Sequence, residues 1–331
     1  MSVIIKEVEN RADRLKFVKF PIDLYKDSPY YVPSLVLDEL DTLNPKKNPA
    51  FDHSESKLFL AYKDGEIVGR IAGIIHHLSN DTWSQNRLRF GFVDFIDDNE
   101  VVDALFDAVV AWGKSQNLDE IHGPLGFTDL DKEGLLVEGF DQEATMSTIY
   151  NHPYYQTQIE RIGFEKDADW HEYRIPVPVA VPERHQRIAN IVMQKYGLKV
   201  LKFKSLKQVT PYIDKLFNLI NKAYAPLYGY VPLTKKQIDH YVKMYVPLLR
   251  WDVVSIIIEE ETDNVVAFGV GMPSLSVGLQ KSKGKLFPFG WFHLLKALKS
   301  KKNPVIDLLL IGVDPEYQGK GVNAVIFSDF I

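Results

Sequence analysis

The feature that most constrains the fold is an order of elements, strand–helix–hairpin–strand–helix, that occurs twice along the chain. In the first half the elements are predicted as follows: a strand at 3–8, a helix at 11–25, a hairpin at 57–76, a strand at 87–96 and a helix that a capping box of Asp97 and Glu100 starts and that ends at Lys114. The hairpin has the clearest signal, because Asp64-Gly65 fits a two-residue turn that needs positive φ.

The second half returns to the same order. Its elements are predicted as follows: a strand at 199–204, a helix at 209–224, a hairpin of strands at 253–260 and 265–272, a flexible basic loop at 281–284, a helix at 291–298 and a strand at 305–313. The last strand is almost entirely apolar, as a central strand covered on both faces would be. We expect an α+β protein of two similar domains, each a mixed central β-sheet flanked by helices.

The boundary between the halves is predicted at a proline-rich stretch, 175–182, because proline fixes an extended backbone without ladder donors. A helix at 145–162 and a closing strand at 164–175 precede this stretch. We therefore expect a first domain over 1–176, a linker and helix over 177–197, and a second domain over 198–331. A length of 331 residues suits two domains.

Composition excludes several classes of protein. The chain has no cysteine, so disulfides, thiolate nucleophiles and cysteine metal sites are excluded. No metal site is expected from the histidines either, because His76, His77 and His122 lack spaced carboxylate partners. The apolar runs are of strand length and the first residues lack the pattern of a signal peptide, so we expect a cytoplasmic protein without a membrane partner.

The charge differs between the halves. Residues 1–182 hold 18 basic and 32 acidic residues, whereas 183–331 hold 21 basic and 12 acidic residues. A polyanionic ligand would prefer the second half, although a drift of solvated surface charge would give the same counts. The acidic first half argues against a nucleic-acid partner, because binding RNA relies on neutralising its phosphates.

One segment, 307–326, has the composition of a ligand site. A buried strand runs into a turn with two glycines, Gly319 and Gly321, and the turn opens a helix. Backbone N–H groups at such a helix start bind phosphate without any side chain, and glycine allows the close approach. The spacing matches neither a nucleotide P-loop nor a dinucleotide fingerprint. A plain glycine turn between strand and helix is the alternative.

The segment resembles the pyrophosphate loop of the GNAT superfamily of acyl-CoA-dependent N-acyltransferases. That loop reads Gln/Arg-x-x-Gly-x-Gly/Ala after the fourth strand, and Val-x-Pro-x-Tyr usually precedes it. Gln318 and Gly321 match the loop, and Asn323 departs from the expected Gly or Ala. The lead-in is matched by Val313, Pro315 and Tyr317.

The resemblance implies that acetyl-CoA or another acyl-CoA is the co-substrate, and that a small-molecule or peptide amine is the acceptor. A homodimer is compatible with it. The pantetheine arm would lie against the backbone of Ile311, Gly312 and Val313. The residues expected around the pyrophosphate are Gln318, Gly319, Lys320, Gly321, Val322, Asn323 and Ala324.

An amine that attacks a thioester must lose a proton, and a carboxylate is the usual base. Asp307 lies on the matching strand and, by period 2, would share an apolar face with Leu309, Ile311 and Val313, where its pKa would be raised. It would equally suit the solvated start of the strand. The superfamily's leaving-group acid is typically a tyrosine beyond the motif, and no residue up to Ile331 is assigned to that role.

Two further groups have open interpretations. Tyr224, Tyr228 and Tyr230 fall where the superfamily has a substrate-facing loop, so they would line an acceptor pocket or simply pack together. A set of lysines would meet the CoA 3′-phosphate, an acidic acceptor or only solvent: Lys281, Lys283, Lys285, Lys299, Lys301 and Lys302.

The first half has Asp97-Asp98-Asn99-Glu100 where the loop should lie, and three carboxylates would repel a pyrophosphate. We predict a tandem GNAT N-acyltransferase, most simply an acetyltransferase, with a first copy that does not bind CoA. A non-catalytic CoA-sensing or assembly module, and a tandem-GNAT aminoacyl-tRNA-dependent transferase, are the alternatives.

Overall fold

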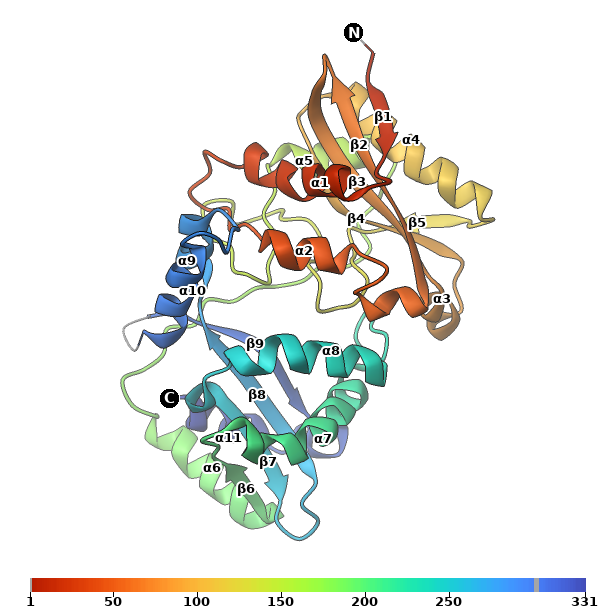
Figure 1. Ribbon diagram of the computed structural model, residues 1–331. Coiled ribbons are helices and arrows are strands. Elements are labelled where there is room, and N and C mark those ends of the chain that lie inside the picture. Colours follow the sequence, from red (N-terminus) through yellow and green to blue (C-terminus); the bar gives the residue numbers. More distant parts are fainter. Residues whose placement is uncertain (1, 301–303) are drawn as a thin grey trace. The chain divides into compact units, whose positions relative to one another are not determined.

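The structure is a computed structural model that describes residues 2–300 and 304–331. The chain forms two compact units. The described residues of the first unit are 2–170 and 275–299, and those of the second unit are 171–274, 300 and 304–331. Each unit is built around one β-sheet, so the predicted α+β architecture of two sheets flanked by helices is confirmed (Figure 1).

The sheet of the first unit has five strands in the order β1-β2-β3-β4-β5. Their bounds are Ile4–Glu7, Ser54–Lys63, Glu66–His76, Arg87–Phe95 and Glu120–His122. Neighbouring strands are antiparallel except β4 and β5, which are parallel, so this sheet is mixed as predicted. The β2–β3 hairpin turns at Asp64 and Gly65, both with positive φ, as their sequence predicts.

Helices cover both faces of this sheet. Their bounds are Arg11–Leu24 for α1, Val36–Thr42 for α2, His77–Trp83 for α3, Asn99–Ser115 for α4 and Tyr154–Arg161 for α5. One core cluster joins α4 and α5 to the sheet, and a second joins α1 and α2 to its other face. The predicted apolar face of α4 is buried, but the helix is capped by Asp98 and not by Asp97.

The sheet of the second unit has four strands in the order β6-β7-β8-β9, and all its described pairs are antiparallel, whereas a mixed sheet was predicted here too. Their bounds are Leu198–Leu201, Val254–Glu259, Val265–Pro273 and Ile306–Val313. The helices of this unit are α6 at Glu183–Tyr196, α7 at Leu206–Tyr224, α8 at Lys235–Tyr245 and α11 at Val322–Phe330. One core contains residues of α7 and α8 and the other contains residues of α6 and α11.

The chain between β8 and β9 packs with the first unit, although the sequence predicted a second domain that runs without interruption from 198. It forms α9 at Ser276–Ser282 and α10 at Gly290–Lys299. Gln280 Nε2 donates to Pro29 O at 2.9 Å, Ser276 Oγ donates to Ala144 O at 3.0 Å, and Val36 N donates to Gly284 O at 2.9 Å. The predicted flexible loop at 281–284 is therefore the end of α9, held by the first unit.

Three sequence predictions fail locally. The helix predicted from 145 begins only at Tyr154, directly after Pro153, and the residues from 145 to 152 form no helix. The closing strand predicted at 164–175 is coil: Phe164 at its start packs against the core of the first unit, but Tyr173 further along is 76% exposed. Strand β9 pairs only with β8 among the described residues, so Ile306 and Leu308 are 49% and 43% exposed instead of covered.

None of the helices in the described ranges has the length and apolar character that crossing a membrane requires.

Candidate functional site

The turn after β9 is shaped by Asp314 and two glycines. Asp314 Oδ1 accepts from the amide of Glu316 at 2.9 Å, and Asp314 O accepts from the amides of Tyr317 and Gln318 at 2.7 and 3.1 Å. Gly319 and Gly321 then take positive φ values of 73° and 82°, which a side chain would strain. Gly321 is the residue that precedes the first turn of α11, and it offers no side chain as a cap.

The start of α11 leaves backbone donors unused. Within the described part of the chain, the amides of Gly319, Gly321, Val322 and Asn323 donate no hydrogen bond. The amides of Lys320 and Ala324 are bonded inside the turn, to Tyr317 O at 3.3 Å and to Gly321 O at 3.0 Å. Since the first N–H groups of a helix carry its positive end, these free amides are candidates to bind an anion.

Side chains add positive charge beside these amides. Lys320 Nζ lies over the rings of Tyr196 and Tyr317, 5.2 and 5.0 Å from their centroids. Tyr317 OH donates to Glu259 at 2.8 Å, and burial together with this carboxylate raises the pKa of Tyr317 to about 12. Because the phenol stays neutral, it remains a platform for the Lys320 ammonium.

The acidic residues before the turn are neutralised. Lys222 Nζ, from α7, lies 2.9 Å from Asp314 and 3.2 Å from Glu316. The predicted loop residue Gln318 is exposed, and its Nε2 donates to Val313 O at 3.2 Å. As far as residues 2–300 and 304–331 show, the turn therefore combines free amides, one lysine ammonium that lies on aromatic rings without an ion pair, and carboxylates that are already bonded.

The predicted pantetheine contact at Ile311 is occupied by a tyrosine. Tyr224 OH donates to Ile311 O at 2.9 Å and accepts from Ile311 N at 3.2 Å, so one hydroxyl satisfies both backbone groups on the open side of β9. A pantetheine amide would have to displace this hydroxyl to bond there. The backbone of Gly312 lies opposite Phe268 on β8.

The three tyrosines predicted as an acceptor wall divide in their roles. Tyr224 and Tyr230 pack edge to face, with centroids 5.7 Å apart, and Tyr230 OH donates to Asn221 at 2.7 Å. Asn221 in turn binds both backbone groups of Leu233. These contacts favour the packing interpretation for two of the three, whereas Tyr228 is 40% exposed.

The predicted base, Asp307, is buried, but not on the predicted face. A bulge falls in the pairing of β9 with β8 between Val270 and Gly271, and Asp307 lies opposite Met272. Opposed residues point to the same face, and Met272 shares its face with Val270, which lies opposite Leu310. The bulge therefore moves Asp307 away from the face of Ile311 and Val313. Six residues separate it from Val313, about 20 Å of strand.

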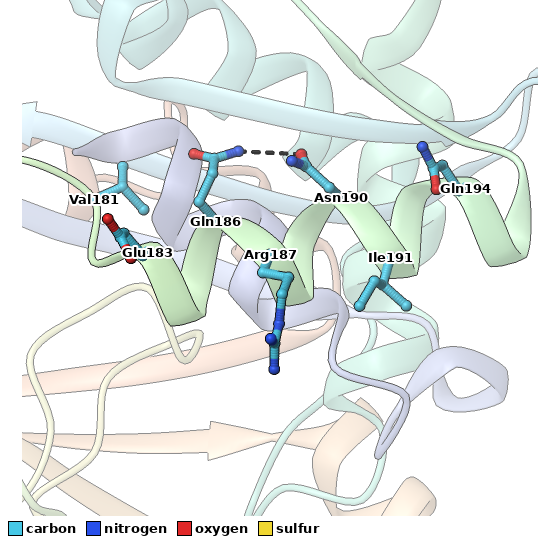
Figure 2. A pocket seen from close by; sticks show the side chains of 7 residues that line it. All are labelled: Val181, Glu183, Gln186, Arg187, Asn190, Ile191 and Gln194. Atoms are coloured by element: carbon cyan, nitrogen blue, oxygen red, sulfur yellow. Dashed lines mark hydrogen bonds between the residues drawn. The ribbon is translucent and has the colours of Figure 1, made fainter.

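A shallow hollow of about 410 Å³ lies along α6, and Figure 2 shows its lining residues, among them Arg187 and Asn190. Gln186 Nε2 donates to Asn190 there at 3.1 Å. None of the predicted site residues lines it. Ile188 and Val192 of the same helix lie beside Gly321, so α6 supports the turn from its other side.

The corresponding junction of the first unit is filled. Asp98 caps α4 by accepting from the amide of Glu100 at 3.0 Å, and Lys63 Nζ bonds Asp98 at 2.6 Å and Glu100 at 3.2 Å. Gln158 Nε2 donates to Asp97 at 2.7 Å and to Asn99 at 2.9 Å. Among the described residues, the start of α4 is thus bonded by side chains of its own unit, and the predicted lack of CoA binding by this copy stays a prediction.

Sequence reasoning missed a buried polar network in the first unit. Arg70 donates to Asp94 at 2.7 Å and to Glu39 at 2.6 Å, Tyr25 OH donates to Asp94 at 2.9 Å, and Tyr155 OH lies 2.6 Å from Tyr25 OH. Desolvation raises the pKa of Asp94, which Arg70 opposes. One signal was present: Arg70 and Asp94 each interrupt an apolar run in neighbouring predicted strands.

A second missed group follows β5. Burial raises the pKa of Asp129 and of Asp131 to about 6 and that of Glu133 to about 8, and it lowers the pKa of His122 to about 4. Asp131 accepts from the amide of Phe127 at 2.7 Å. Glu133 Oε1 and both ring nitrogens of His122 have no hydrogen-bond partner within the described ranges. These acids lie in a partly buried loop, and among the described residues no group of histidines and carboxylates is arranged to hold a metal ion.

Comparisons with solved structures define the class. A tandem GNAT protein from the clavulanic acid biosynthesis pathway superposes with a TM-score of 0.50 at 10% identity, over 98% of this chain and 83% of that chain. At this identity the likeness shows the fold: the protein has the tandem GNAT fold, as the loop motif predicts.

Curated relatives define the family. Protein YghO of Escherichia coli (strain K12) is 30% identical over 327 residues, 98% of this chain and 82% of that protein. A bacterial ceramide synthase of Caulobacter vibrioides (strain NA1000 / CB15N) is 30% identical over 324 residues, 96% of this chain and 82% of that protein. The chain belongs to the family of these two proteins. A comparison with known family profiles found no match.

Proposed function

We propose that the protein is an acyl-CoA-dependent N-acyltransferase whose second unit binds the CoA diphosphate at the start of α11. The observation that carries the proposal is the set of free amides at Gly319, Gly321, Val322 and Asn323. The ammonium of Lys320, held over two tyrosine rings, adds charge of the right sign. The tandem GNAT fold, whose acetyltransferases use acyl-CoA, supports the same co-substrate.

For the acceptor, we propose an amine that carries a long apolar chain, and a fatty acyl group in place of the acetyl group. The support is the relative named as a bacterial ceramide synthase, because a ceramide is a long-chain amino alcohol with a fatty acyl group on its nitrogen. In the reaction the amine nitrogen attacks the thioester carbonyl, the C–S bond breaks, and the thiolate leaves as free CoA thiol after it takes up a proton. The amine gives its proton to a base.

Asp307 stays our candidate for that base. It is the buried carboxylate on the strand that leads to the turn, with 8% of its surface exposed. The bulge beside it would aim the carboxylate toward the face of Leu310, so an acceptor amine must approach from that face.

The experiment is a thiol-release assay on the full chain, with acetyl-CoA and palmitoyl-CoA as donors and with sphinganine and a short amine as acceptors. We expect turnover that is fastest with palmitoyl-CoA and sphinganine. Asp307→Asn should lower kcat by about a hundredfold or more. Asp263→Asn, at an exposed carboxylate paired with Lys215, is the matched control and should keep full activity.

CoA binding without turnover, for any pair of substrates, would favour the CoA-sensing module. A chain that neither binds nor cleaves acyl-CoA, yet transfers an aminoacyl group from charged tRNA, would favour the tRNA-dependent alternative.

A further inference from the structure

The segment of α9 and α10, residues 275–299, presents exposed aromatic side chains next to lysines. We propose that this segment, called here the α9–α10 face, docks the protein onto the surface of an anionic lipid bilayer. The proposal does not rest on the acyl-transfer function, and it replaces the expectation of a protein without a membrane partner. Docking on the surface needs no spanning helix.

The apolar part of the α9–α10 face consists of side chains that project into solvent. Phe287 and Phe289 are 73% and 72% exposed, and Phe292 and Trp291 of α10 are 54% and 45% exposed. Leu295, one helical turn after Trp291, is also exposed. Large aromatic residues gathered in this way are rare on the free surface of a soluble protein and mark an interaction site.

These side chains do not hold the segment together. Leu279, Leu294 and Leu298 are the buried apolar residues of α9 and α10, and the contacts of Ser276 and Gln280 fasten α9 to the first unit. Trp291 Nε1 donates to Pro288 O at 3.0 Å, which fixes the indole at the start of α10. The exposed rings are therefore presented by a fixed support and are available to an external partner.

The charge of the segment identifies that partner. Its charged residues are Lys281, Lys283, Lys285, Lys296 and Lys299, with no acidic residue between 275 and 299. All five lysines are exposed, and no ion pair reaches them from the residues that the structure describes. Aromatic rings enter the headgroup region of a bilayer, while lysines beside them bind anionic headgroups. The predicted lysine run thus fits a lipid surface; Lys301 and Lys302 lie outside the described residues.

The test is flotation of the full chain with two kinds of vesicle, phosphatidylcholine alone and phosphatidylcholine mixed with phosphatidylglycerol. We expect the protein to float with the mixed vesicles and about tenfold less with the neutral ones. Raising the salt to about 1 M, where the Debye length is about 3 Å, should release most of it.

Variants separate the two parts of the face. The triple variant Phe287→Ser, Phe289→Ser and Phe292→Ser should lose flotation about tenfold, whereas Tyr173→Ser, at an equally exposed ring outside the segment, should not. Lys281→Gln with Lys283→Gln and Lys285→Gln should weaken binding to the mixed vesicles only, with Lys207→Gln as control. Lysine variants leave the fold intact, so they keep the test valid should the aromatic variant fail to fold.

Equal flotation of the aromatic variant and the wild type, or no flotation at all, would overturn the proposal. So would a dimer in light scattering that the aromatic variant breaks, because the face would then bind a second copy of this chain.

Discussion

Two strand-to-helix junctions, β4–α4 and β9–α11, occupy the same place in the same architecture. They differ in whether a side chain accepts hydrogen bonds from the first amides of the helix. At β4–α4, Asp98 caps the helix and Lys63 bonds Asp98 and Glu100. At β9–α11, Gly321 precedes the helix with no capping side chain, and four amides donate no hydrogen bond within the described ranges. The first helix start is satisfied by side chains of its own chain, whereas the second leaves backbone donors that an anion can use.

The difference also concerns how each helix dipole is met. At β4–α4 the carboxylate of Asp98 places negative charge beside the first amides of α4. At β9–α11 no side chain caps the helix, so an anion from solution would take the equivalent place. The proposed CoA site uses this difference.

The largest effect is expected at Gly321. Its φ of 82° disfavours a β-branched residue, so Gly321→Val should move the amides of the turn and lower the affinity for CoA by about a hundredfold. Isothermal titration with CoA measures it. Gly65→Ala, at a φ of 86° in the hairpin of the first unit, carries similar strain and should bind CoA normally. Equal losses in both variants would show a general effect of stability and would break the comparison.

A second prediction concerns the buried acids of the first unit. Burial raises the pKa of Glu133 from 4.5 to about 8, so the folded protein keeps a proton that the unfolded chain has lost. The stability should therefore fall as the pH rises from about 4.5 to about 8 and stay low above that range. Glu133→Gln removes this loss, and it should be more stable than wild type by about 2–4 kcal/mol near pH 9.

Urea unfolding at several pH values measures the effect of Glu133→Gln. The free energies of unfolding of the variant and the wild type should converge below about pH 4, because the carboxyl is then neutral in the folded and the unfolded state. A constant difference at all pH values would show that the substitution acts through packing and not through titration.

A smaller effect is expected at the cap of the first unit. Asp98→Ala removes the bond to the amide of Glu100 and the ion pair with Lys63, and it should destabilise the protein by about 1–2 kcal/mol. CoA affinity, read by titration, should stay unchanged because the proposed CoA site lies in the second unit. A loss of CoA binding as large as that of Gly321→Val would contradict the assignment of the site to β9–α11.

The smallest effect is expected at Tyr224. Tyr224→Phe frees the N–H and C=O of Ile311, so the affinity for CoA should rise by about threefold if the pantetheine arm bonds there. Tyr230→Phe removes a buried hydroxyl bond to Asn221 and is the matched control, which should lose stability without a change in affinity. A lower affinity of Tyr224→Phe would mean that the hydroxyl itself contacts the ligand.

The sequence predicted the elements whose signals are local. The turn at Asp64-Gly65, the end of α6 at Gly197 and the glycine turn before α11 follow from positive φ, which few residues other than glycine adopt. The prediction of a closing strand at 164–175 was wrong because a strand forms only against a neighbouring strand with free backbone groups. The strand at the edge of the sheet, β5, has only three residues. The face of Asp307 was wrong because a bulge is set by the pairing of two strands.

The candidate site divides in the same way. The glycines were predicted from the local strand–turn–helix pattern, since phosphate binding by amides is a property of one short segment, and Gln318 was predicted from the resemblance to the GNAT loop. The hydroxyl of Tyr224 on Ile311 joins residues 87 positions apart, and nothing in either neighbourhood marks it. The network of Arg70, Glu39 and Asp94 also joins residues far apart in the sequence. A charged residue within an apolar strand is a signal, and a predicted pairing of the two strands would have placed Arg70 beside Asp94.

The packing of residues 275–299 with the first unit makes the covalent path between the units threefold. The backbone leaves the first unit after Trp170, returns to it at Leu275 and leaves it again after Lys299. A single cut in the proline-rich linker would thus leave the first unit incomplete. The upstream fragment would lack α9 and α10, and the downstream fragment would carry these two helices without the residues that they pack against. Dissection of this protein requires a graft of 275–299 onto the upstream fragment and a short bridge from β8 to β9.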